Sequence, residues 1–125
     1  MNVVKLDHLS LVVRDWRAAR DWYMRHLGLG LEFEIPERRT AALQDDAGLT
    51  LFVAESDEPV GPRSCVLTFQ VGDVEEHHRR LAAAGVAFEC APSKRFWGYG
   101  AELRDLDGYL VYLWDERSMR EKGGA

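Results

Sequence analysis

The chain has 125 residues, of which 46% are hydrophobic and 30% charged, and its 16 Lys and Arg against 21 Asp and Glu give a net charge of −5. This length predicts one domain whose halves share a core, and the acidic balance speaks against a nucleic-acid partner. No apolar run approaches the roughly 20 residues that cross a bilayer and no secretory signal pattern opens the sequence, so we expect a cytoplasmic protein without a membrane partner.

The first half of the chain is expected to form a strand, a helix and three further strands. Residues 5–13 are rich in Leu and Val and alternate in polarity, which is typical of a strand. Asp15 is a suitable helix N-cap, and apolar residues follow it at helical spacing until Gly28 supplies a stop. Strands are then predicted over 31–35, 39–43 and 49–54, and an acidic turn joins the last two.

A segment that contains prolines and a glycine, about 56–62, marks the joint between the two halves. Beyond it, Asp73 and Glu76 are spaced as in a capping box, and the helix they begin ends near Gly85. The predicted strands of this half are 64–71, 87–90, 100–104 and 110–114. The tail, about 117–125, is charged and ends in small residues, so we expect it to be flexible.

The two halves repeat the same landmarks at a nearly constant distance. The N-cap residues Asp15 and Asp73 are 58 residues apart, and the turn glycines Gly48 and Gly108 are 60 apart. A period of this length indicates one supersecondary module copied once. The predicted bounds are about 1–56 for module one, 56–62 for the linker, 63–116 for module two and 117–125 for the tail, all within a single domain of residues 1–125.

Each half has the order β-α-β-β-β, so we predict an α+β fold. Two such modules in tandem would form a curved mixed sheet with the helices on its outer face. The uncovered face would then be a concave cup, and concave, mostly apolar surfaces of this kind bind small molecules.

Three motifs in this order resemble those of the vicinal oxygen chelate superfamily. They are the opening His8–Asp15, the helix end from Trp22-Tyr23 to Leu27-Gly28, and the closing segment Asp105–Leu113. The superfamily includes glyoxalases, extradiol dioxygenases, and fosfomycin- and bleomycin-resistance proteins. The resemblance covers about residues 5–115 and implies the same duplicated fold, whereas it leaves the chemistry open.

The resemblance also implies where a metal would bind, because metal-dependent members place one ligand on each of four strands. The corresponding positions in this sequence are His8, Phe52, Val66 and Tyr112. One imidazole among such side chains is a poor ligand set for a divalent cation. Glu102 could also face the cup, but the sequence identifies no partners for it. We therefore expect no metal and no other cofactor.

Aromatic residues occupy the place of the missing ligands. By strand alternation, Phe52, Tyr112 and Trp114 share the face of His8, while Trp97 lies in a glycine-flanked loop similar to the Trp-Gly segment of bleomycin-resistance proteins. Stacking and cation–π contacts contribute about 0.5 to 2 kcal/mol each. The predicted ligand-binding residues are His8, Ser10, Phe52, Val66, Thr68, Trp97, Tyr99, Tyr112 and Trp114.

The leading hypothesis is a metal-independent protein that binds an aromatic or cationic, antibiotic-like small molecule and forms a homodimer. No catalytic residue is identified; His8 is the only candidate, because imidazole titrates near neutral pH. One alternative is a metal-dependent lyase, isomerase or dioxygenase with an atypical ligand set that includes His8. The other is a dimeric scaffold whose cup is filled by its own side chains.

Overall fold

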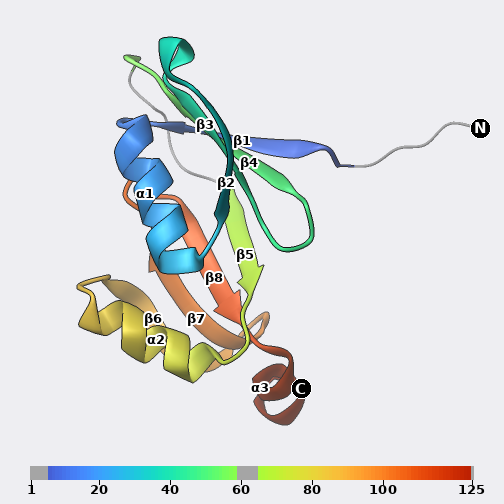
Figure 1. The fold of residues 1–125 in the computed structure, drawn as a ribbon. Coiled ribbons are helices and arrows are strands. Elements are labelled where there is room, and N and C mark those ends of the chain that lie inside the picture. Colours follow the sequence, from blue (N-terminus) through green and yellow to red (C-terminus); the bar gives the residue numbers. More distant parts are fainter. Residues whose placement is uncertain (1–5, 59–64, 125) are drawn as a thin grey trace, which may run out of the picture. The chain divides into compact units, whose positions relative to one another are not determined.

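Two four-stranded mixed sheets, one from each half of the chain, form the core of the computed structural model (Figure 1). The structure describes residues 6–58, here called module one, and residues 65–124, called module two. The chain divides into two compact units, residues 1–61 and 62–125. Most of the predicted linker, 56–62, lies outside the described residues.

Module one places its first strand parallel to its last. Its elements are β1 (His8–Val13), α1 (Trp16–Leu27), β2 (Gly30–Ile35), the 3₁₀ helix η1 (Pro36–Arg38), β3 (Thr40–Gln44) and β4 (Thr50–Glu55). The strand order is β1-β4-β3-β2, with β1 and β4 parallel and the other pairs antiparallel. Helix α1 packs on β3 and β4, so one sheet face is covered by a helix.

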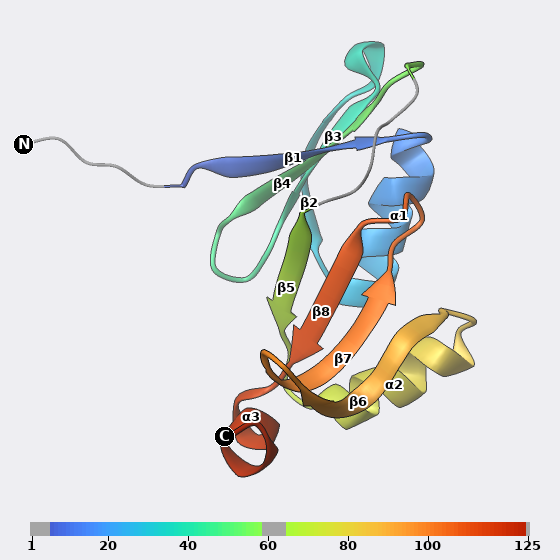
Figure 2. The ribbon, with the colours of Figure 1, turned by 180° about the vertical axis from the view of Figure 1, so that it is seen from behind.

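Module two repeats this plan. Its elements are β5 (Val66–Gln70), α2 (Val74–Ala83), β6 (Phe88–Arg95), β7 (Gly98–Arg104), β8 (Leu110–Trp114) and α3 (Glu116–Lys122). The strand order is β5-β8-β7-β6, again with the first strand parallel to the last. Helix α2 packs on β6 and β7 (Figure 2). The α+β class and the two tandem β-α-β-β-β modules are thus confirmed, whereas the shared core and the concave cup stay predictions.

The helices bury apolar stripes against their sheets. Helix α1 buries Trp16, Ala19, Trp22 and Tyr23, and α2 buries Val74 and Leu81. Both N-caps are confirmed: the Asp15 carboxylate accepts from the Arg17 and Ala18 amides, and the Asp73 carboxylate accepts from the Glu76 amide at 3.1 Å. None of the described helices is long and apolar enough to cross a membrane.

The structure differs from the sequence-based expectation at two places in module two. Strand β6 continues to Arg95 rather than ending at Cys90, because its register with β7 shifts twice and so accommodates Pro92. The tail that was expected to be flexible contains α3, which packs on β7. Its Met119 sulfur accepts a hydrogen bond from the Tyr99 amide at 3.3 Å, and this contact ties the helix to the strand.

The acidic turns are built identically in the two copies. The Asp45 carboxylate accepts from the amides of Ala47 and Leu49, both at 2.9 Å. The Asp105 carboxylate accepts from the amides of Asp107 and Tyr109, also at 2.9 Å. Gly48 and Gly108 have φ of 88° and 89°, a conformation that favours glycine. These turns join β3 to β4 and β7 to β8 in the antiparallel registers of their own sheets.

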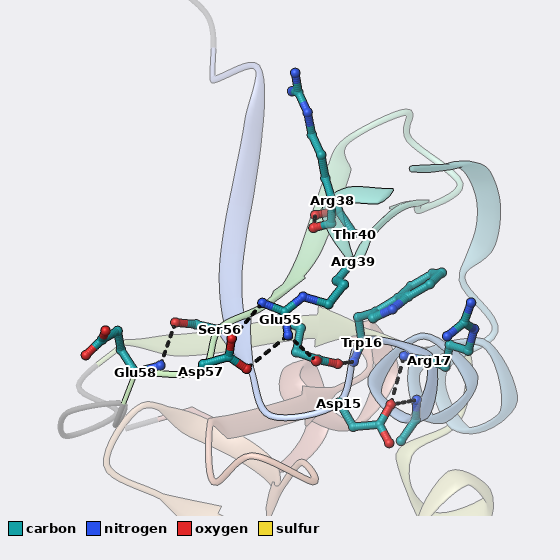
Figure 3. Close-up of polar contacts among 11 residues, drawn as sticks. Asp15, Trp16, Arg17, Arg38, Arg39, Thr40, Glu55, Ser56, Asp57 and Glu58 are labelled. Carbon is teal, nitrogen blue, oxygen red and sulfur yellow. Dashed lines mark hydrogen bonds and ion pairs between the residues drawn. The ribbon is translucent and has the colours of Figure 1, made fainter. Parts of the chain in front are cut away.

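A second carboxylate, from the end of the last strand, reaches the first turn of each helix. In module one, Glu55 Oε1 accepts from the Trp16 amide at 3.1 Å, while Glu55 Oε2 pairs with Arg39 at 2.8 Å (Figure 3). In module two, Asp115 Oδ2 accepts from the Val74 amide at 2.6 Å. Asp115 Oδ1 also accepts from the Ser118 amide at 2.6 Å, so Asp115 caps α2 and α3 at once.

We predict that Asp115→Ala lowers the free energy of unfolding by about 1 to 4 kcal/mol, because it removes the cap of α3 and a second hydrogen bond, to the first amide of α2, and each such contact contributes about 0.5 to 2 kcal/mol. Asp73→Ala removes one cap and should cost about 1 kcal/mol. Urea denaturation followed by circular dichroism measures both. Equal losses in the two variants would contradict the double role of Asp115.

The stability of the Asp115→Ala variant should also depend less on pH in the acid range than that of the unaltered protein. Burial raises the pKa of Asp115, but hydrogen bonds from Val74 and Ser118 outweigh it and hold the pKa below 3.8. The stabilisation is therefore present above pH 3.8 and is lost as the pH falls through the lower pKa of the folded state. Asp115→Ala should lose less stability than the unaltered protein over that range of pH.

Candidate functional site

The face of the module one sheet that α1 leaves uncovered carries an aromatic row. Strand alternation sends Leu11 and Val13 into the core and leaves His8 on the other face. The His8 ring meets Phe52 edge to face with centroids 4.9 Å apart, and Phe52 meets Phe33 in the same way at 5.8 Å. Phe33 was not predicted as a site residue; the register of β2 with β3 shifts between Leu31 and Phe33, so simple alternation along β2 does not place it.

A pocket of about 610 Å³ opens beside this row. Its polar lining includes Asp7, His8, Glu32 and Thr50, and none of the described residues that line it is Lys or Arg. His8 Nδ1 lies 3.0 Å from Asp7 Oδ2, and the Thr50 hydroxyl donates to Glu32 Oε1 at 2.7 Å. The pocket is therefore a partly aromatic surface with acidic groups, which suits a ligand that carries an aromatic ring or a positive charge.

In module two, the uncovered sheet face carries two stacked aromatic rings. The Trp97 indole and the Tyr112 ring are 4.8 Å apart and 10° from parallel. Trp97 lies in the turn between β6 and β7 and folds back over Gly100, where an added Cβ would lie 2.5 Å from Trp97 Cη2 and would also meet the Leu113 carbonyl oxygen. Glycine at position 100 thus permits the indole to lie close to the sheet.

Glu102 supports this stack from the strand below it. Its Oε2 accepts from Trp97 Nε1 at 2.9 Å and from Arg95 Nε at 3.1 Å. The hydrogen bond and charge of Glu102 raise the pKa of Arg95, which stays protonated. The partners of Glu102 that the sequence left unidentified are therefore the indole and a guanidinium group.

The remaining predicted residues lie on the expected strand faces. Ser10 pairs with Phe52 across β1 and β4, and Thr68 pairs with Tyr112 across β5 and β8. Val66 is exposed and Trp114 is half-buried. These placements agree with the predicted alternation within each module, while the ligand-binding role of the residues stays a prediction.

Tyr99 does not join Trp97. It is 9% exposed, and its hydroxyl donates to Glu75 on α2 at 2.7 Å. Its ring also lies 5.0 Å from the Lys122 ammonium of α3. Strand β7 therefore turns Tyr99 toward the helices, on the face opposite Glu102, and the structure gives it contacts of the protein core rather than of the stacked pair.

The residues present do not fit the divalent metal that the resemblance implies. His8 is the one imidazole at the four corresponding positions, and Phe52 and Val66 offer only carbon atoms. Within the described residues of either module, no three His, Cys, Asp or Glu side chains gather as a metal site would require. We therefore derive no chemical step from a metal ion.

Comparisons with known proteins agree with this architecture. The sequence model of the glyoxalase/bleomycin resistance protein/dioxygenase superfamily matches residues 5–113. The solved structure of TioX from Micromonospora sp. ML1 is similar, with 29% identity, a TM-score of 0.70, and 88% of this chain and 97% of that chain covered. No curated protein matches the chain.

Two further solved structures share the fold at lower identity. A possible glyoxalase from Bacillus cereus has 21% identity and a TM-score of 0.74, with 89% of this chain and 98% of that chain covered. The fosfomycin resistance protein FosX from Listeria monocytogenes has 21% identity and a TM-score of 0.75, with 90% and 91% covered. These two similarities show the fold and leave the ligand undefined.

We predict that one tyrosine of the folded protein ionises only near pH 12. The hydrogen bond to Glu75 and burial raise the pKa of Tyr99 to about 12 from 10.0. Its contribution to stability is thus complete below pH 10 and is lost as the pH rises through about 12. An ultraviolet absorbance titration should show this step, and Tyr99→Phe should remove it and cost about 1 kcal/mol of stability at neutral pH. A titration unchanged by the substitution would contradict the assignment.

Proposed function

Because the chain belongs to the glyoxalase/bleomycin resistance protein/dioxygenase superfamily, we propose that it binds a small organic molecule with a planar ring, without a metal ion. The observation that carries this proposal is the stacked pair of Trp97 and Tyr112 on an uncovered sheet face. Flat aromatic surfaces of this kind bind planar rings by offset stacking. Phe52 and Val66, with hydrocarbon side chains, stand at two of the four positions where metal-dependent members would need ligands, and this also supports the proposal.

The residues that line the pocket of module one indicate which further chemical groups a ligand could carry. Asp7 and Glu32 give it negative charge, and Phe33 and Phe52 give it an aromatic wall. A cationic group would be attracted by both features. The pocket also favours a ligand-binding protein over a scaffold whose face is filled by its own side chains. We therefore include aromatic cations among the proposed ligands.

We extend the proposal to antibiotic-like compounds. The structurally similar FosX is named for fosfomycin resistance, and the superfamily description includes bleomycin resistance. A protein that sequesters such a compound needs a shaped surface and no catalytic group, and this agrees with the absence of an identified catalytic residue in the sequence. Catalysis by His8 and an atypical metal remains the competing hypothesis, which the titration below also tests.

We predict saturable binding of at least one planar antibiotic when the purified protein is titrated by calorimetry against a panel of such compounds. Trp97→Ala should weaken that binding about 5- to 30-fold, since an aromatic contact contributes roughly 1 to 2 kcal/mol. His77→Ala, at a half-buried position on α2, is the control for substitution of an aromatic side chain outside the proposed surface. Stoichiometric metal in the purified protein, lost together with activity in His8→Ala, would overturn the proposal in favour of a metal enzyme.

We also propose that the protein is a homodimer in the cytoplasm. Exposed apolar side chains lie on the two edge strands of the module one sheet, Leu9 and Val12 on β1 and Leu31 on β2, and another copy could cover one of these edges. Sedimentation at micromolar concentration should give twice the mass of one chain. A species with the mass of one chain under those conditions would contradict the dimer.

A further inference from the structure

The carboxylate of Glu102 is nearly buried at the centre of the module two sheet, where an apolar side chain would be expected. Glu102 lies on β7, one of the two inner strands of its sheet, and is 8% exposed. Removing a carboxylate from water costs several kcal/mol unless its partners compensate for the lost hydration. An apolar side chain of similar size would avoid this cost at the same place.

The other copy of the module shows that the sheet itself does not require the carboxylate. Glu102 pairs with Tyr112 across β7 and β8. The equivalent pair in module one, 60 residues earlier, joins Ala42 on β3 to Phe52 on β4. The strand order and turn geometry are the same in both modules, and yet module one has a methyl group at this position. The reason for Glu102 therefore lies in what is particular to module two.

Module two differs from module one in the turn between β6 and β7, which places the aromatic side chain of Trp97 over the sheet. Trp97 belongs to the two-residue turn between β6 and β7, where strand alternation fixes no side-chain direction. Its neighbour in that turn, Phe96, is 91% exposed. The indole, in contrast, is held by its stack on Tyr112 and by the 2.9 Å hydrogen bond from Nε1 to Glu102 Oε2.

The same oxygen of Glu102 also holds the strand that enters the turn. Arg95 Nε donates to Oε2 at 3.1 Å, so residues on both sides of Phe96 are joined to one carboxylate. Hydrogen bonds to a charged acceptor are shorter and stronger than those between neutral groups. The hydrogen bond sets the direction of Nε1–H, and the stack on Tyr112 sets the plane of the indole.

We propose that Glu102 is a positioning residue, which holds the Trp97 indole parallel to Tyr112 and so prepares the stacked surface before a planar ligand arrives. This inference rests on the proposed function. A side chain that is already ordered before binding loses no conformational freedom when the ligand binds. The affinity for the ligand is therefore higher. Glu102 acts through Trp97 and need not touch the ligand.

The experiment compares three variants in ligand-free protein and then with ethidium, a planar fluorescent cation. Glu102→Leu removes the acceptor, and Glu102→Gln keeps an acceptor without the charge. Glu89→Gln is the matched control, because the Glu89 carboxylate pairs at 3.0 Å with Arg104 across the same two strands, on an exposed surface. Trp97→Phe assigns the Nε1–H resonance of Trp97 among the four tryptophans.

In ligand-free protein, Glu102→Leu should shift the Trp97 Nε1–H resonance, speed its exchange with water and weaken the near-ultraviolet circular dichroism of the stacked rings. Glu102→Gln should show a smaller change and Glu89→Gln none. Ethidium affinity should fall about 5- to 10-fold in Glu102→Leu and about 2-fold in Glu102→Gln. If Glu102→Leu does not fold, the resonance and affinity of Glu102→Gln against Glu89→Gln decide the question.

Two results would overturn the inference. An unchanged Trp97 resonance and exchange rate in the Glu102 variants would show that the carboxylate does not position the indole. A displaced indole with unchanged ethidium affinity would show that positioning does not serve binding. Failure of the unaltered protein to bind ethidium or any planar compound contradicts the proposed function instead, and the ligand-free spectra then still decide whether Glu102 positions Trp97.

Discussion

The parallel pairing of the first and last strands of each module is the constraint on which the rest of the structure depends. Because parallel strands end at the same sheet edge, the helix that follows the first strand begins beside the end of the last. Glu55 and Asp115 use this proximity to bind the first helical amides, those of Trp16 and Val74. The helix is thereby fixed on one face of its sheet, and the opposite face is left uncovered.

The two copies share this frame and differ on their uncovered faces. Module one has a pocket with an aromatic wall and acidic groups. Module two has a stacked pair, which rests on the buried carboxylate Glu102. A duplicated fold that preserves its caps and turns can change its open faces freely, because residues there contribute little to the cores. Among the described residues, neither face gathers three potential metal ligands, and we propose that both suit a planar or cationic organic molecule.

Sequence patterns predicted the elements well where the signals are local. The N-cap residues Asp15 and Asp73, the acidic turns and the strand alternation all depend on neighbours within a few positions, and the structure confirms them. The prediction was wrong for the end of β6, and it did not include the helix that the tail forms. In the first case an irregular register accommodates Pro92, and in the second Met119 and the double cap of Asp115 stabilise a helix that its own sequence would not.

The sequence by itself determined the α+β class, the duplication and, within each module, the sheet face on which His8, Phe52 or Tyr112 lies. These features depend on period-2 alternation and short-range hydrogen bonds, which involve only residues close together in the chain. Only the tertiary structure decided the partners of Glu102 and the different surroundings of Trp97 and Tyr99. These two residues are separated by one position and would share a face within a strand. Since Trp97 precedes the first residue of β7, it folds back over Gly100, while the strand turns Tyr99 toward Glu75.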